Sequence, residues 1–159
     1  MVGAGISTLR KTTMTNPSEL LTSLIGSLDL DDYEDISTGT VTLLNPSTQA
    51  PTTSTITLAS REHQSRKQID MARTRKLRSA FNQTGKMPVS DPVDDIADET
   101  DYLVASTLGW NLTQGGKQLA FSADAARKLY SDPKKQWVRA QVLAAINKTE
   151  LFISSSAKS

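Results

Sequence analysis

The fold is decided first by residues 40–58, which read TVTLLNPSTQAPTTSTITL. Apolar and polar residues alternate in both halves, and the NPSTQAP segment between them has the composition of a turn. The pattern predicts two antiparallel strands joined as a hairpin. The apolar residues expected on one face of it are Val41, Leu43, Ile56 and Leu58. Because a lone hairpin is marginal in water, we expect it to pack on a helix or to pair with strands of another copy.

Before the hairpin, helical spacing predicts a short helix over residues 17–28. Asn16 suits the cap and Pro17 the first helical position. An apolar stripe follows at intervals of three and four residues, formed by Leu20, Leu21, Leu24, Ile25 and Leu28. Two interpretations remain open, since such a stripe suits either a helix facing the core or a docking helix that fills a groove in a partner.

After the hairpin, helices are predicted near residues 61–84, 92–109, 123–131 and 133–148. Their starts are indicated by Asp91-Pro92, Ser122 and Asp132-Pro133, and Gly85 indicates a stop. A glycine-rich turn over 109–116 and an extended link are expected between the second and third of these helices. One C-terminal core should collect Trp110, Phe121, Leu129, Trp137, Val142 and Phe152.

These patterns predict an α+β fold, mainly α-helical, with an N-terminal β-hairpin followed by a small helical domain. Three regions are expected: residues 1–39 as an N-terminal arm with a short helix, 40–153 as the hairpin and helical domain, and 154–159 as a flexible tail. Apolar residues make up only 37% of the chain. A chain this polar either exposes much surface or completes its core against a partner.

Little in the sequence suggests catalysis. The chain has no cysteine and a single histidine, His63, which lies among polar residues. Thiolate chemistry and multi-histidine metal sites are therefore excluded. The acidic run from Asp29 to Asp35 lacks the glycine and glutamate positions of a calcium loop. We expect no enzymatic activity, no metal and no cofactor.

Charge is segregated along the chain although the net charge is only +1. Residues 61–86 carry eight Lys or Arg, and residues 91–101 carry six carboxylates and no base. Three interpretations are open: attraction between two adjacent helices, contact of the basic helix with an acidic protein, and nucleic-acid binding. The last is disfavoured because no aromatic residues interleave with the arginines. The candidate partner-binding arginines are Arg66, Arg73, Arg75 and Arg78.

Residues 40–153 resemble small proteins encoded in the tail modules of tailed bacteriophages, described as tail assembly chaperones or minor tail proteins. The resemblance is carried by the order of the hairpin, the basic helix, DYLVASTLGW at 101–110, FSADAARKLY at 121–130, Asp132-Pro133, and WVRAQV at 137–142. Residues 1–39 lie outside it.

This resemblance implies a non-enzymatic protein that binds other phage tail or virion proteins during virion morphogenesis. The alternatives are a structural virion component, such as a minor tail, connector or capsid-associated protein, and a nucleic-acid-binding protein that uses the basic helix 61–86. Self-association through the hairpin edge is a further expectation. No segment reaches the ~18 apolar residues of a membrane span. The location that the resemblance implies is the host cytoplasm during assembly, with the virion as the alternative.

Overall fold

The computed structural model describes residues 26–155, which fall into two units. In the first unit, the 3₁₀ turn η1 (Leu30–Asp32) is capped by Asp29, whose carboxylate accepts the N–H of Asp31. Residues 26–29 are not helical, and the rest of the helix predicted over 17–28 lies outside the described residues. Along the chain, the boundaries between the two units fall within strands β1 (Tyr33–Asp35) and β7 (Ile153–Ser155).

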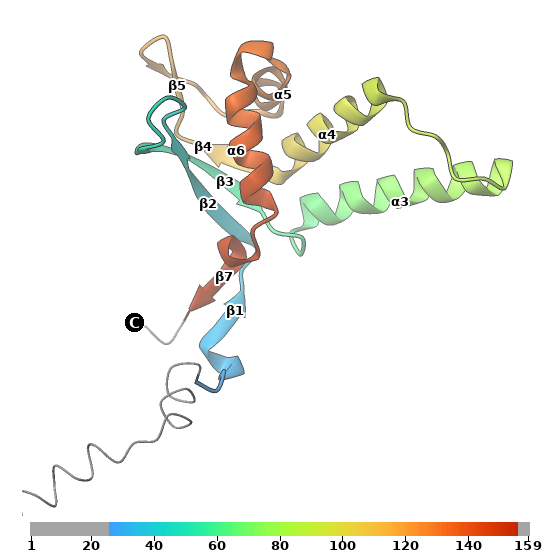
Figure 1. The fold of residues 1–159 in the computed structure, drawn as a ribbon, viewed down its shortest axis with the longest axis horizontal. Coiled ribbons are helices and arrows are strands. Elements are labelled where there is room, and N and C mark those ends of the chain that lie inside the picture. The colour runs from blue at the N-terminus through green and yellow to red at the C-terminus, as the bar shows by residue number, and fades with distance from the viewer. Residues whose placement is uncertain (1–25, 156–159) are drawn as a thin grey trace, which may run out of the picture. The chain divides into compact units, whose positions relative to one another are not determined.

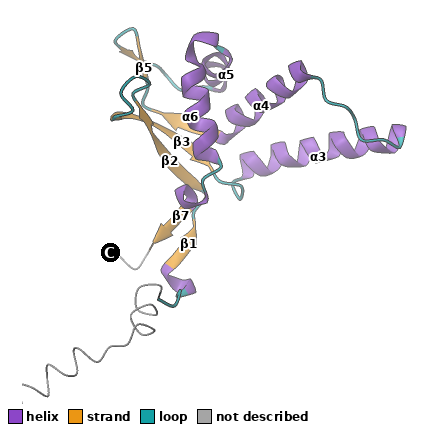
Figure 2. Cartoon of the chain, in the orientation of Figure 1, coloured by secondary structure: helices purple, strands orange, loops and turns teal. Residues whose placement is uncertain are grey.

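The second unit, residues 35–154, is built on a three-stranded antiparallel sheet. Its strands are β2 (Thr38–Leu44), β3 (Pro51–Ala59) and β4 (Thr107–Trp110), in the order β2-β3-β4 (Figures 1 and 2). The predicted hairpin is confirmed, with Val41 opposite Ile56. The neighbouring strand that the hairpin needs comes from its own chain, since Ile56 also pairs with Trp110.

The sequence pattern did not indicate β4. We expected a helix through residue 109, but α4 (Pro92–Ser106) ends three residues earlier. Thr107 is β-branched and favours an extended backbone. Its hydroxyl bonds to the carbonyl of Leu103 and to the Tyr130 hydroxyl. The free edge of β3 then offers unpaired backbone groups, which the TLGW segment satisfies.

The helices begin and end close to the predicted positions. They are α3 (Gln64–Thr84), α4, α5 (Ala123–Ser131) and α6 (Gln136–Ile146), with short 3₁₀ turns η2 (Pro133–Lys135) and η3 (Thr149–Phe152). Asp91 and Ser122 cap α4 and α5 as expected, and Gly85 ends α3 with a φ of 68°. The predicted turn before α5 folds as a small ladder of β5 (Thr113–Gln114) and β6 (Lys117–Gln118). The mainly helical α+β fold is therefore confirmed.

The core lies where α4, α5, α6 and η3 pack against the sheet. Its buried residues are Leu43, Ile56, Leu58, Leu103, Leu112, Ala126, Tyr130, Val138, Val142, Ala145, Ile146 and Phe152. Gly39 marks the closest approach, because a Cβ there would lie 2.5 Å from the carbonyl oxygen of Leu151. We call the sheet with α5, α6 and the packed end of α4 the body.

The predicted C-terminal core is partly wrong. Val142 and Phe152 are buried, whereas Trp137 and Phe121 are 36% and 37% exposed. Helix α6 turns Val138, Val142 and Ala145 toward the core, and Trp137 lies about 100° around the helix from Val138. The large buried aromatic residue is instead Tyr130 at the end of α5.

Helices α3 and α4 leave the body as a pair joined by residues 85–91 (Figures 1 and 2). Near the body they are held by Tyr102, whose ring lies 5.1 Å from the Arg66 guanidinium and 4.9 Å from that of Arg73. Farther out the two helices diverge (Figure 1). We call residues 74–98 the tip of this helix pair.

Candidate partner-binding surfaces

The structure distributes the predicted partner-binding residues among different environments. Leu20, Leu21, Leu24 and Ile25 lie outside the described residues. Leu28 is described and is 72% exposed. Nothing in the described part of the chain therefore tests the stripe as a docking helix, and it stays a prediction.

Arg66, which the sequence analysis named as a candidate partner-binding residue, is buried. Its side chain is only 1% exposed. One terminal nitrogen donates to the carbonyl of Ala59 at 3.1 Å, the other bonds to the Tyr102 hydroxyl, and Nε has no protein acceptor. Arg66 lies in the first turn of α3, next to the sheet. Because its side chain is buried there, it is not on a surface that a partner could contact.

Arg73 is half-buried and also acts within the chain. It donates to the carbonyl of Asp98 at 2.8 Å, besides stacking on Tyr102. Arg75 and Arg78 remain exposed. They follow Arg73 by two and five residues, so helical periodicity places them on the side of α3 that faces away from α4.

The expected attraction between the basic and acidic helices is not made by ion pairs. Among residues 26–155, none of the ion pairs joins α3 to α4. The carboxylates at the inner end of α4 pair elsewhere: Glu99 with Arg139 of α6 at 2.7 Å, and Asp101 with Arg127 of α5. Arg139 also donates to Thr100 and to the carbonyl of Tyr130. These bonds fasten α4 to the body.

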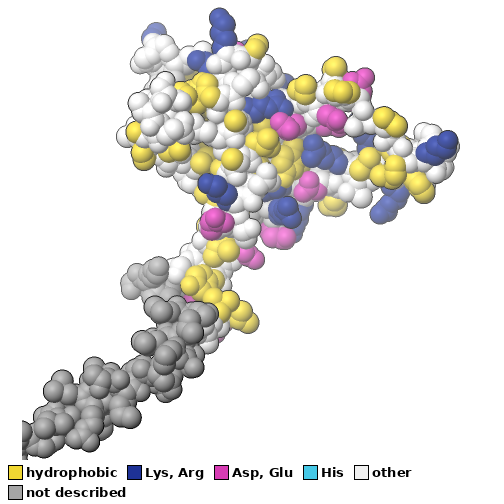
Figure 3. All heavy atoms as spheres, in the orientation of Figure 1, with side chains coloured by type: hydrophobic (Ala, Val, Ile, Leu, Met, Phe, Trp, Pro, Cys, Tyr) yellow, Lys and Arg dark blue, Asp and Glu magenta, His cyan; other side chains and the backbone are white. Residues whose placement is uncertain are grey.

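The tip of the helix pair is the largest group of exposed apolar side chains on the described chain. Leu77 and Phe81 on α3 are each 47% exposed, and Val89 in the connection is 97% exposed. Figure 3 shows hydrophobic side chains over both helices of the pair. The other exposed apolar residues of the tip are Met87, Val93 and Ile96. Apolar groupings of this kind mark interaction surfaces in soluble proteins.

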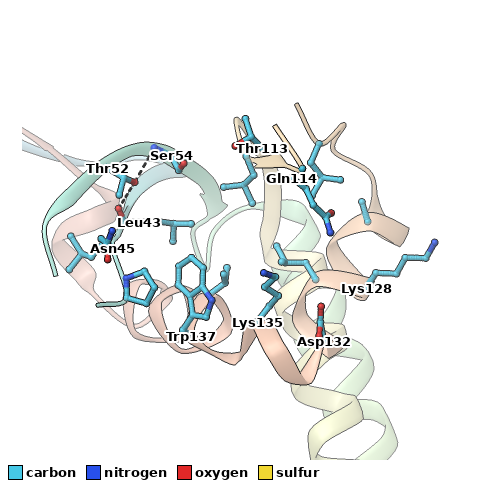
Figure 4. A pocket seen from close by; sticks show the side chains of 18 of the residues that line it. Leu43, Asn45, Thr52, Ser54, Thr113, Gln114, Lys128, Asp132, Lys135 and Trp137 are labelled. Atoms are coloured by element: carbon cyan, nitrogen blue, oxygen red, sulfur yellow. Dashed lines mark hydrogen bonds between the residues drawn. The ribbon is translucent and has the colours of Figure 1, made fainter. Parts of the chain in front are cut away.

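A cavity of about 670 Å³ lies at the opposite end of the sheet. It is lined by the β2–β3 turn, the β5–β6 ladder, α5 and the start of α6. Figure 4 shows Trp137 and Lys135 pointing into its opening, with Leu43 behind them and Lys128 directed away. Its apolar wall can accept an apolar group, and its rim carries both lysines and aspartates.

Two titratable groups within residues 26–155 have clear local roles. His63 caps α3, where Nδ1 accepts the N–H of Ser65, so its ring is used by the helix start. Burial raises the pKa of Tyr130 to about 12, although its bond to Thr107 opposes the shift. In this part of the chain no group of three or more His, Asp or Glu is placed to hold a metal ion. No helix there has the length and apolarity needed to cross a lipid bilayer.

No protein-family model, no curated protein and no solved structure matches this chain. Function must therefore be argued from the surfaces themselves.

Sequence reasoning missed both the tip and the cavity. The low apolar content did indicate that core completion against a partner was an option. Periodicity shows which residues of the tip share a face but does not show whether another element covers that face.

Proposed function

We propose that this chain is a non-enzymatic assembly factor, a phage tail assembly chaperone-like protein that binds another tail protein during virion morphogenesis. The observation that carries the proposal is the exposed apolar tip of the helix pair. Burying apolar area supplies about 25 cal/mol per Å², so this is the surface with the most affinity to offer. The resemblance of residues 40–153 to phage tail assembly chaperones indicates the class of partner, which is another phage tail or virion protein.

Two further features support a binding role. The tip stands away from the body, so that it can be covered without disturbing the core. The body is fastened by its own sheet, by the Arg139 network and by Gln141, whose amide bonds both backbone groups of Leu44 on the β2 edge. A rigid base with an open apolar extension suits a protein that holds another chain temporarily.

The main alternative is a structural virion component, which would use the same tip permanently. The hairpin no longer favours it, because β4 of the same chain supplies a neighbouring strand, and pairing with another copy was only one of the two options that the sequence left open. Self-association through the β2 edge stays a prediction, with Leu44 already bonded by Gln141.

The deciding experiment removes the gene from the phage that encodes it and analyses complete particles by mass spectrometry. We expect tailless particles without the gene, and finished wild-type particles that lack the protein. Rescue by Met71→Asp and failure of rescue by Leu77→Asp would locate the activity at the tip. Recovery of the protein in finished particles at fixed stoichiometry would overturn the chaperone role in favour of the structural one.

A further inference from the structure

The two inner faces of the tip do not match each other. Tyr102 and the carbonyl of Asp98, both on α4, contact Arg73 of α3 and thereby define which faces oppose. Counting outward from Arg73 by four and seven residues gives Leu77 and Ala80 on the inner face of α3. Phe81 lies at the edge of that face. The middle of the inner wall of α3 is therefore apolar, and Lys76, three residues from Arg73, lies at its other edge.

The inner wall of α4 is acidic. Counting outward from Tyr102 by four, seven and eleven residues gives Asp98, Asp95 and Asp91. No ion pair in the described chain involves these carboxylates. Asp91 caps α4 and Asp95 accepts a hydrogen bond from the Ser90 hydroxyl, and both remain exposed.

This mismatch gives a physical reason for the divergence of the helices. Closing the tip would bury carboxylates against Leu77 and Ala80 with few counter-charges, which is strongly unfavourable. Lys76 lies at one edge of the inner face of α3, whereas Arg75 and Arg78 lie on the far side. None of these bases forms an ion pair with a carboxylate of α4 in the described residues. Helices α3 and α4 therefore approach each other only near Tyr102, whose ring lies close to the guanidinium groups of Arg66 and Arg73.

We infer that the tip receives an amphipathic helix with a basic edge, and that this helix lies between α3 and α4. Its apolar side would cover Leu77 and Phe81, and its Lys or Arg side chains would face Asp95 and Asp98. Such a helix supplies both elements that the tip lacks, an apolar cover for α3 and counter-charges for α4. The inference rests on the proposed function and specifies the chemistry of its partner. It differs from one of the three interpretations that the charge pattern left open, contact of the basic helix with an acidic protein.

The test uses synthetic peptides of about 18 residues, or five helical turns. The first carries Leu on one face and Lys on the other, the second replaces each Lys by Glu, and the third is a scrambled Leu/Lys peptide of equal charge. Fluorescence anisotropy at physiological ionic strength should show the Leu/Lys helix binding at least about tenfold more tightly than either control, a difference set by both burial and charge.

Matched variants locate the site. Leu77→Asp should weaken binding of the Leu/Lys peptide at least about tenfold, whereas Met71→Asp, similarly exposed but on the other side of α3, should leave it within about twofold. Asp95→Asn with Asp98→Asn should reduce binding and flatten its salt dependence. Asp124→Asn on α5 is the charge control.

Equal binding of the Leu/Glu peptide, or equal losses from Leu77→Asp and Met71→Asp, would overturn the inference. So would a dimer that Leu77→Asp dissociates in the absence of peptide, because a second copy would then be the occupant. The proposed function fails differently. If the Leu77→Asp protein fully rescues tail assembly, the tip is not the surface that binds the tail protein, and the proposed function is wrong. If the Leu77→Asp protein fails to rescue but the Leu/Lys peptide does not bind the wild-type protein, only the inferred chemistry of the partner is wrong.

Discussion

The body and the tip of the helix pair are built from similar residues and differ in how those residues are covered. Leu103, near the inner end of α4, is fully buried under α5 and α6, while Leu77 on α3 is half-exposed. In the body the polar groups are bonded within the chain, as Arg139 shows with Glu99, Thr100 and Tyr130. At the tip, carboxylates lack cationic partners and apolar groups lack cover. Stability is concentrated in the body, and the tip is left available for recognition.

A matched pair of leucine truncations tests this contrast most strongly. Leu103→Ala should lower the free energy of unfolding by about 2–5 kcal/mol, because it leaves a cavity in the core. Leu77→Ala should change it by no more than about 0.5 kcal/mol, as expected for an exposed position. Urea unfolding followed by circular dichroism measures both. Similar losses from the two variants would mean that the tip contributes to the same core.

Alkaline pH should weaken the body through Tyr130. The folded-state pKa is raised to about 12, above the ordinary value of 10.0, so the folded state keeps its proton where the unfolded state has lost it. Stability is therefore fully present below pH 10 and falls as the pH rises toward 12, by about 2–3 kcal/mol in total. Urea unfolding at pH 9 and pH 11.5 should show the loss.

Tyr130→Phe is the control for this titration. The substitution removes the bond to Thr107 and lowers stability at pH 9. It should also abolish the part of the stability loss between pH 9 and pH 11.5 that Tyr130 causes. Tyr33 and Tyr102 are present in both proteins, so the comparison isolates Tyr130. A Tyr130→Phe protein with an unchanged alkaline loss would assign the effect to another group.

Two arginine substitutions compare a buried, hydrogen-bonded side chain with one in an exposed ion pair. Arg139→Met should cost about 2 kcal/mol, since Thr100 and the carbonyl of Tyr130 lose a donor, with the Glu99 contribution reduced by its exposure. Arg127→Met removes an ion pair whose side chains are 52% and 48% exposed, and should cost less than about 1 kcal/mol. Thermal or urea unfolding of both variants gives the comparison, and the reverse order would show that α4 is fastened through α5.

The smallest of these effects concerns Trp137. Trp137→Ala should cost about 1–2 kcal/mol rather than the 3–5 kcal/mol of a fully buried aromatic residue, because the indole lines the open cavity. Its fluorescence should also be quenched by added iodide, unlike that of a core tryptophan, with Trp110→Phe used to isolate the signal. A loss above 3 kcal/mol would restore the core role that its spacing suggested.

The helices and the hairpin followed from local chemistry that can be read without a structure. Capping by Asp91 and Ser122, the stop at Gly85 and the alternation around Ile56 each act over a few residues, so sequence alone determined them. The absence of cysteine and the single histidine likewise excluded thiolate chemistry and multi-histidine metal sites from the sequence alone.

Only the tertiary structure decided which faces are covered. Thr107 to Trp110 became a strand because the edge of β3 was free, and Arg66 became buried because α3 starts against the sheet. Trp137 was left at a cavity, and Leu77 was left 47% exposed. Periodicity fixes the side of an element on which a residue lies. Whether that side meets the core, a charge or solvent depends on contacts between segments far apart in the chain, which local propensities do not encode.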